Sequence, residues 1–183
     1  ADTAATELYD GSSWSVTANM STARGYLAGA GTSSQGLAFG GGPPYSNATE
    51  EFSNFSEPSS FQNDGQVFYN DTEFKFKVTS STTTPSWASG GNYPANIQRQ
   101  AGFGTQTATV NASGYEGTAY STNTKEYDGT AWTAANASPA ALESPGGGGV
   151  LTAGFICGGE SPAPAKVTTT AEYDGTNWTA GGA

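Results

Sequence analysis

The sequence predicts an all-β fold built from repeats of short antiparallel strands. The hexapeptide Tyr-Asp-Gly-Thr-Ala-Trp at residues 127–132 recurs with small changes at residues 9–14 and 173–178. Glycine alone supplies 26 of the 183 residues, whereas charged residues make up only 12%. A recurring motif, many turn-forming residues and few strong helix formers together favour short strands joined by glycine-rich turns.

Each copy of the hexapeptide is typical of a β-hairpin. In the first copy, residues 6–9 form the expected outgoing strand and residues 14–17 the returning strand. An Asp-Gly pair between aromatic runs is a strong hairpin signal, because glycine adopts positive φ without a Cβ clash. We expect the aspartates of this motif to cap their own turns rather than to bind metal or act as catalytic acids; they are Asp10, Asp128 and Asp174.

Two further strands are expected near residues 26–30 and 36–39 of the first unit. A shift of 73 residues then places Trp14 on Trp87 and opens a second unit. A shift of 118 residues places Tyr9 on Tyr127 and opens a third. We expect one domain, residues 1–183, of three blade-like units followed by a partial fourth from Thr170 onward. The period of about 45 residues holds four short strands.

Residues 53–86 form an insertion between the aromatic residue and the tryptophan of one copy, Phe52 and Trp87. Within it, Phe74, Phe76 and Val78 alternate with two lysines, which gives one apolar and one charged strand face. The sequence therefore predicts an inserted β-hairpin flanked by a Ser/Thr-rich tract. It is either a protruding contact element or a strand pair that extends a sheet.

The order of these signals resembles the kelch repeat, in which a double glycine after a strand is followed by a tyrosine and then a tryptophan. The matching residues are Gly40-Gly41, Phe52 and Trp87, then Gly158-Gly159, Tyr173 and Trp178. The middle unit departs from the pattern, with Ser113-Gly114 in place of the double glycine. The residue pattern also looks like the kelch-type repeats of phage and viral fibre or surface proteins. Outside residues 53–86, the resemblance implies a β-propeller fold.

Composition argues against several classes of function. The net charge is −10, so the clustered basic residues that bind nucleic acid are lacking. No apolar run approaches 18 residues, so we expect no membrane insertion. With no histidine and only two arginines, Arg24 and Arg99, we expect neither an enzyme nor a cofactor or metal site. The single cysteine, Cys157, is expected to be a small buried apolar residue.

The four tryptophans have two interpretations: packing between repeat units, which we favour, or exposed platforms that stack on sugars; they are Trp14, Trp87, Trp132 and Trp178. Seven of the eleven asparagines stand in Asn-x-Ser/Thr sequons, whereas the Ser and Thr content predicts about three by chance. The excess favours a secreted or surface protein with covalent N-glycans. The sequons are at Asn19, Asn47, Asn54, Asn70, Asn111, Asn136 and Asn177.

Three units do not close a propeller, for which about four blades is the usual minimum. Open sheet edges and a surplus hairpin copy suggest head-to-tail addition by strand sharing, in which a strand of one subunit completes a sheet of the next. The expected subunit contacts are Tyr9, Trp14, Tyr173 and Trp178. We therefore expect a structural subunit of an extracellular or virion surface fibre whose main partner is itself. The alternatives are a module that binds a glycan or host receptor, and a fragment of a longer closed propeller.

Overall fold

The computed structural model of the protein describes residues 2–42, 44–54, 67–70, 72, 74–78 and 85–182. Every regular element in these ranges is a β-strand, and every strand pairing is antiparallel. The all-β prediction is therefore confirmed. Over the same ranges there is no helix long and apolar enough to cross a bilayer.

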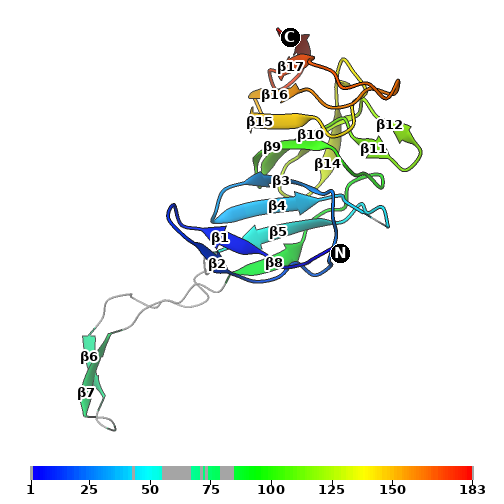
Figure 1. The fold of residues 1–183 in the computed structure, drawn as a ribbon. Helices are drawn as coiled ribbons and strands as arrows, with labels where there is room; N and C mark the ends of the chain where they lie inside the picture. The colour runs from blue at the N-terminus through cyan, green and yellow to red at the C-terminus, as the bar shows by residue number, and fades with distance from the viewer. Residues whose placement is uncertain are drawn as a thin grey trace.

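Three four-stranded sheets follow one another along the chain (Figure 1). Sheet one contains, in spatial order, β3 (Ala28–Gly31), β4 (Gln35–Phe39), β5 (Thr49–Ser53) and β8 (Ser86–Ser89). Sheet two contains β9 (Ala101–Thr105), β10 (Ala108–Ala112), β13 (Thr124–Tyr127) and β14 (Trp132–Ala135). Sheet three contains β15 (Gly146–Val150), β16 (Ala153–Cys157), β17 (Thr170–Tyr173) and β18 (Trp178–Ala180).

Three two-stranded hairpins accompany these sheets. The first is β1 (Glu7–Tyr9) with β2 (Trp14–Val16), the second is β6 (Val67–Asn70) with β7 (Lys75–Val78), and the third is β11 (Tyr115–Glu116) with β12 (Ala119–Tyr120). The second hairpin lies inside the insertion, as predicted, and stands clear of the three sheets in Figure 1. The Ser/Thr-rich tract at residues 80–84 lies outside the described residues.

The strand register confirms the repeat alignment read from the sequence. In every copy the motif aromatic residue lies directly opposite its tryptophan on the neighbouring strand. Even the broken copy obeys this rule, because Phe52 pairs with Trp87 across the whole insertion. The insertion therefore emerges from the turn between two adjacent strands of sheet one and leaves their pairing intact.

The predicted position of the incomplete unit is wrong. The last hairpin, β17–β18, does not begin a fourth unit, because it completes sheet three. The unfinished unit is the first hairpin, β1–β2, on the N-terminal side of sheet one. A strand that ends in the double glycine has two hydrogen-bonding edges. The strand before it pairs with one edge and the following hairpin pairs with the other.

The first strand of sheet three escaped sequence reasoning because it consists almost wholly of glycine. Residues 146–149 are four consecutive glycines, yet they pair along β16. Close packing on sheet two accounts for Gly147 of this strand and for Gly154 of β16. A Cβ on Gly147 would lie 3.0 Å from the Ala101 side chain, and a Cβ on Gly154 would lie 2.0 Å from the Phe103 ring. The missing side chains allow the two sheets to approach.

The hydrophobic core is divided between the two junctions of neighbouring sheets. One cluster joins sheets one and two and includes Leu37, Phe39, Tyr127 and Trp132. The other joins sheets two and three and includes Phe103, Val110, Ile156 and Tyr173. The stability of each sheet therefore depends on its packing against the neighbouring sheet.

Candidate assembly interface

The hairpin turn of the motif is held by its aspartate, as predicted. In the copy at residues 127–132, Asp128 Oδ1 accepts the backbone N–H groups of Thr130 and Ala131, both at 2.8 Å. Asp10 and Asp174 make the same pair of bonds in their own turns. These backbone donors hold the pKa of each carboxyl below its usual range, so the turns carry fixed negative charge at neutral pH.

Each turn brings a tyrosine and a tryptophan into ring contact. The ring centroids of Tyr127 and Trp132 are 5.0 Å apart with an interplanar angle of 39°. Tyr173 and Trp178 repeat this geometry at 4.8 Å and 35°. Because the pair is set by one short hairpin, the same local shape is available at every copy of the motif.

This aromatic pair attaches sheet two to sheet one. Tyr127 Oη donates a 2.5 Å hydrogen bond to Glu51 Oε1 on β5. Beside it, Trp132 Nε1 donates to Thr49 Oγ1 at 3.1 Å. Burial of the phenol, with the Glu51 carboxylate as a second cause, raises the pKa of Tyr127 to about 12. The hydroxyl is therefore a permanent donor over the ordinary pH range.

Sheet three is attached to sheet two by the same two bonds. Tyr173 Oη donates to Glu126 Oε1 at 2.5 Å, and Trp178 Nε1 donates to Thr124 Oγ1 at 3.0 Å. Burial, followed by contact with Glu126, raises the pKa of Tyr173. The sheets thus stack in one direction, with the hairpin of each unit contacting the third strand of the unit before it.

Only half of the predicted subunit contacts are free in this fold. Tyr9 is 47% exposed and Trp14 is 67% exposed on the β1–β2 hairpin. Tyr173 and Trp178 were also predicted to contact another subunit, but they already pack against sheet two. That part of the prediction is wrong, because the last hairpin belongs to a complete sheet whose inner face is covered.

The free surface at the C-terminal end is instead the outer face of sheet three. The cross-strand pairs Leu37–Glu51 and Phe39–Thr49 of sheet one recur in sheet two as Val110–Glu126 and Ala112–Thr124, and in sheet three as Phe155–Glu172 and Cys157–Thr170. The apolar and threonine members are at most 3% exposed in sheets one and two, where the next sheet covers them.

In sheet three the same positions lie open to solvent. Phe155 is 42% exposed, Cys157 and Glu172 are exposed, and Thr170 is partly exposed. An open cleft of about 470 Å³ lies here, lined by Phe155, Thr170 and Glu172 together with Thr152, Ala153, Gly154, Tyr173, Asp174 and Thr179. The prediction that Cys157 is buried is therefore wrong, since no sheet formed by the described residues lies over it.

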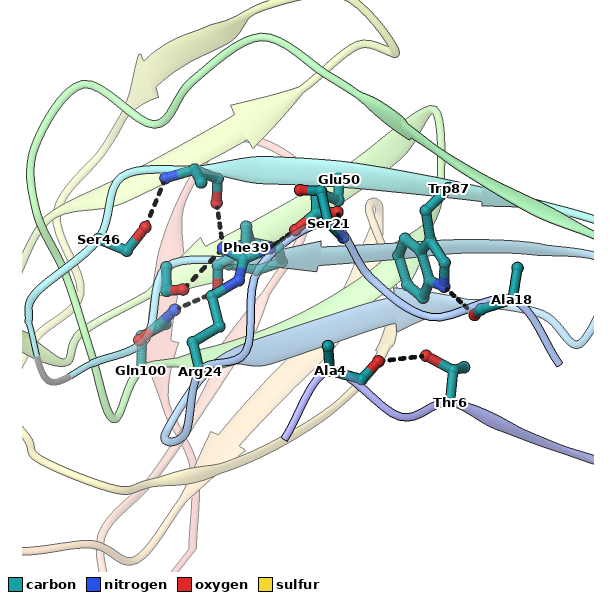
Figure 2. A network of polar contacts seen from close by, with 12 residues as sticks. Ala4, Thr6, Ala18, Ser21, Arg24, Phe39, Ser46, Glu50, Trp87 and Gln100 are labelled. Atoms are coloured by element: carbon teal, nitrogen blue, oxygen red, sulfur yellow. Dashed lines mark hydrogen bonds and ion pairs between the residues drawn. The ribbon is translucent and has the colours of Figure 1, made fainter. Parts of the chain in front are cut away.

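At the opposite end of the stack, the N-terminal segment lies against sheet one. Trp87 Nε1 donates to the Ala18 carbonyl at 3.0 Å, and Ser21 N–H donates to Glu50 Oε2 at 2.7 Å (Figure 2). Arg24 bonds the carbonyls of Gly40 and Ala48 and forms a buried ion pair with Glu50 at 2.8 Å. The segment that follows β2 is thereby fixed to sheet one. Its hairpin remains the exposed terminus of the stack.

The predicted glycosylation sites fall into three groups. Asn19, Asn136 and Asn177 are exposed, and Asn47, Asn54 and Asn70 are partly exposed. Asn111 is fully buried on β10, where its Nδ2 donates to Tyr93 Oη at 2.8 Å. The prediction of a glycan at Asn111 is therefore wrong, because this fold leaves no room for a sugar on that side chain.

Sequence reasoning missed the glutamates that receive the tyrosine hydroxyls. Their signal was present, because an acid immediately precedes the motif aromatic residue in three of the four copies: Glu51, Glu126 and Glu172. Over the described residues, no group of three or more His, Cys, Asp or Glu side chains is arranged to hold a metal ion.

No family model matches the chain, and no curated protein matches it in sequence. Among solved structures, it is similar to the structure of YjhT, with a TM-score of 0.65 over 92% of this chain and 11% sequence identity. This chain spans about half, 49%, of the length of that YjhT chain. At 11% identity the likeness shows the fold alone.

Proposed function

We propose that this protein is a non-enzymatic structural subunit of an extracellular or virion surface fibre, built from kelch-like propeller sheets that assemble head to tail. One observation carries the proposal. The outer face of sheet three exposes Phe155, Cys157, Thr170 and Glu172 at positions that a following sheet covers elsewhere in the chain. A face shaped to lie under another sheet supports a role in assembly.

The two ends of the stack differ, which supports head-to-tail rather than face-to-face contact. One end carries the exposed β1–β2 hairpin, and the other carries the open cleft on sheet three. Contacts between unlike surfaces generate rings where the rotation closes and filaments where it does not. A fibre subunit requires contacts of this second type.

Sedimentation analysis of the purified 183-residue chain tests the proposal directly. We expect species at multiples of 18.6 kDa whose proportion rises with protein concentration, and regular filaments or rings in negative-stain micrographs. A chain that stays at 18.6 kDa up to about 100 µM would contradict self-assembly, because a specific interface of ordinary size binds more tightly than that.

N-glycosylation is a separate part of the proposal. It is supported by the exposure of Asn19, Asn136 and Asn177 in the described part of the chain. After expression through a eukaryotic secretory pathway, we expect glycans at these three sites and none at buried Asn111. Peptide mass spectrometry before and after glycosidase treatment measures the occupancy. Unmodified side chains at all three exposed sites would remove this part of the proposal.

A second candidate function is a module that binds carbohydrate or a receptor. It is favoured by the insertion hairpin, which exposes Tyr69, Phe74 and Phe76. Exposed aromatic rings of this kind can stack on sugar faces. Binding to a glycan array that is lost in the Phe76→Ser variant would favour this function.

The open face of sheet three is also consistent with a longer polypeptide that continues into further sheets. In that case the covering sheet belongs to the same chain, and the protein is one part of a closed propeller. Intact mass spectrometry of the native polypeptide separates this reading from self-assembly, since a native mass far above 18.6 kDa favours continuation.

A further inference from the structure

The tyrosines and glutamates of the motif pair between neighbouring units in a fixed order. Tyr127 of sheet two bonds Glu51 of sheet one, and Tyr173 of sheet three bonds Glu126 of sheet two. In both cases the acceptor is the residue immediately before the motif aromatic residue of the preceding unit. Each unit therefore offers a carboxylate to the tyrosine of the unit that follows.

The one exception among the units obeys the same logic. Sheet one has Phe52 at the aromatic position, which carries no hydroxyl to donate. In the preceding unit, the position of the acid is occupied by Leu8 on β1. A carboxylate is thus present where the next unit has a tyrosine, and an apolar residue stands where it has a phenylalanine. A partly buried carboxylate without a donor would be costly, which gives this correlation a physical reason.

This order leaves one tyrosine without a carboxylate and one carboxylate without a tyrosine. Within the described part of the chain, Tyr9 Oη donates only to the carbonyl of Gly11 in its own turn, at 2.9 Å. Glu172 lines the open cleft, and its side chain has no hydrogen-bond or ion-pair partner within the described ranges. Likewise, Trp14 is exposed and Thr170 is partly exposed. They occupy the positions equivalent to Trp132 and Thr49, which form a hydrogen bond between sheets two and one.

We propose that Tyr9 and Trp14 of one copy dock on the outer face of sheet three of a second copy. Tyr9 Oη donates to Glu172, and Trp14 Nε1 donates to Thr170 Oγ1. This inference rests on the proposed head-to-tail assembly and specifies its junction. The partner of the open face is thus a second copy of this chain, joined by a contact that the chain already makes twice internally.

The β1–β2 hairpin already has the shape of the docked hairpins. The Tyr9 and Trp14 rings lie 5.1 Å apart at 36°, close to the geometry of the two docked pairs. Asp10 fixes the turn through the N–H groups of Ser12 and Ser13. Because little conformational freedom remains to be lost, docking avoids part of the usual entropic cost of association.

Packing at the junction follows the template between sheets one and two. There the Trp132 ring lies 4.8 Å from the Phe39 ring. Cys157 occupies the position of Phe39 in sheet three, so Trp14 of the second copy covers the Cys157 thiol. The single cysteine of the chain is therefore a built-in reporter of the junction.

Substitutions at the two surfaces test the pairing by sedimentation equilibrium. Trp14→Ala should weaken association about 100-fold or more, as loss of a central aromatic anchor does. Tyr9→Phe and Glu172→Leu should each weaken it about tenfold, and the double variant should lose much less than the product of the two effects. Phe76→Ser, which removes an exposed aromatic ring from the insertion hairpin, is the matched control and should leave association unchanged.

Mixing two defective variants gives a test that does not depend on affinity values. Trp14→Ala retains an intact acceptor face, and Glu172→Lys retains an intact donor hairpin. Each should be monomeric alone, and an equimolar mixture should form dimers that go no further. In the wild-type chain and in the mixture, maleimide labelling of Cys157 should slow as association proceeds.

Two results would overturn the junction in distinguishable ways. If the wild-type chain associates but Trp14→Ala and Glu172→Lys associate equally well, the junction is wrong and the proposed assembly stands on another surface. If the wild-type chain is monomeric at every concentration, the proposed assembly and the junction both fail. Circular dichroism and melting curves confirm that each variant is folded, which the exposure of the substituted side chains predicts.

Discussion

The hydroxyl of Tyr127 lies 2.5 Å from Glu51 Oε1 and ties the third strand of sheet two to the third strand of sheet one. The two residues are 76 positions apart in the chain. This hydrogen bond therefore joins two sheets, and its strength contributes to the cooperative unfolding of the three sheets.

Tyr127→Phe should lower the free energy of unfolding by about 1–2 kcal/mol, because a hydrogen bond to a charged group is lost and Glu51 keeps its desolvated carboxylate. Urea denaturation followed by tryptophan fluorescence measures the change. Tyr69→Phe, on the exposed insertion hairpin, is the control and should change stability by less than about 0.5 kcal/mol. Equal effects of the two variants would contradict the assigned role of the hydroxyl.

The same bond predicts a specific response to alkaline pH. The folded-state pKa of Tyr127 is raised to about 12 from an ordinary value of 10.0. A raised folded-state pKa contributes stability that is fully present below pH 10.0 and is lost as the pH rises through about 12. The stability difference between wild type and Tyr127→Phe should be constant from pH 7 to pH 10 and then shrink, measured by denaturation at each pH. A difference that grows above pH 10 would contradict the prediction.

Gly104→Ala should destabilise sheet two severely. Gly104 has φ of +110°, and a Cβ there would lie 2.2 Å from the Ala108 carbonyl oxygen, which belongs to the backbone and has little freedom to move. We expect a loss of at least about 3 kcal/mol in thermal or urea unfolding, from strain in φ and from the clash. Gly117→Ala is the matched control, since φ is +67° and no atom lies within 4 Å. It should cost about 1 kcal/mol.

Arg24→Met should reduce the free energy of unfolding by about 3–5 kcal/mol, because it leaves Glu50 buried without its cation. Both side chains of the pair are at most 4% exposed. The double variant Arg24→Met with Glu50→Leu should be more stable than Arg24→Met alone, since no uncompensated charge remains. Guanidinium chloride denaturation of Arg24→Met, Glu50→Leu and the double variant measures the coupling, and strictly additive losses would contradict it.

Much of the local structure could be predicted from the sequence because its causes are local. The Asp-Gly turn, its aspartate cap and the aromatic pair all depend on residues within six positions of one another. The same is true of the hairpin in the insertion, which alternation of side chains predicted. The strand register also confirms the repeat alignment predicted from the sequence, since each copy carries the same local signals.

The tertiary structure decided everything that depends on what lies opposite a residue. Cys157 and Ala112 occupy the same register position, yet only Ala112 is covered by a further sheet. Asn111 stands in a sequon like the others but is fully buried.

The sequence by itself thus determined the repeating hairpins, their turns and the all-β class, because each depends on neighbouring residues. Only the packing of the three sheets shows which hairpin is surplus, which face is open and which tyrosine is hydrogen-bonded to a carboxylate. Those properties depend on contacts between units tens of residues apart, and a repeat gives every unit the same signal whether or not a neighbour follows.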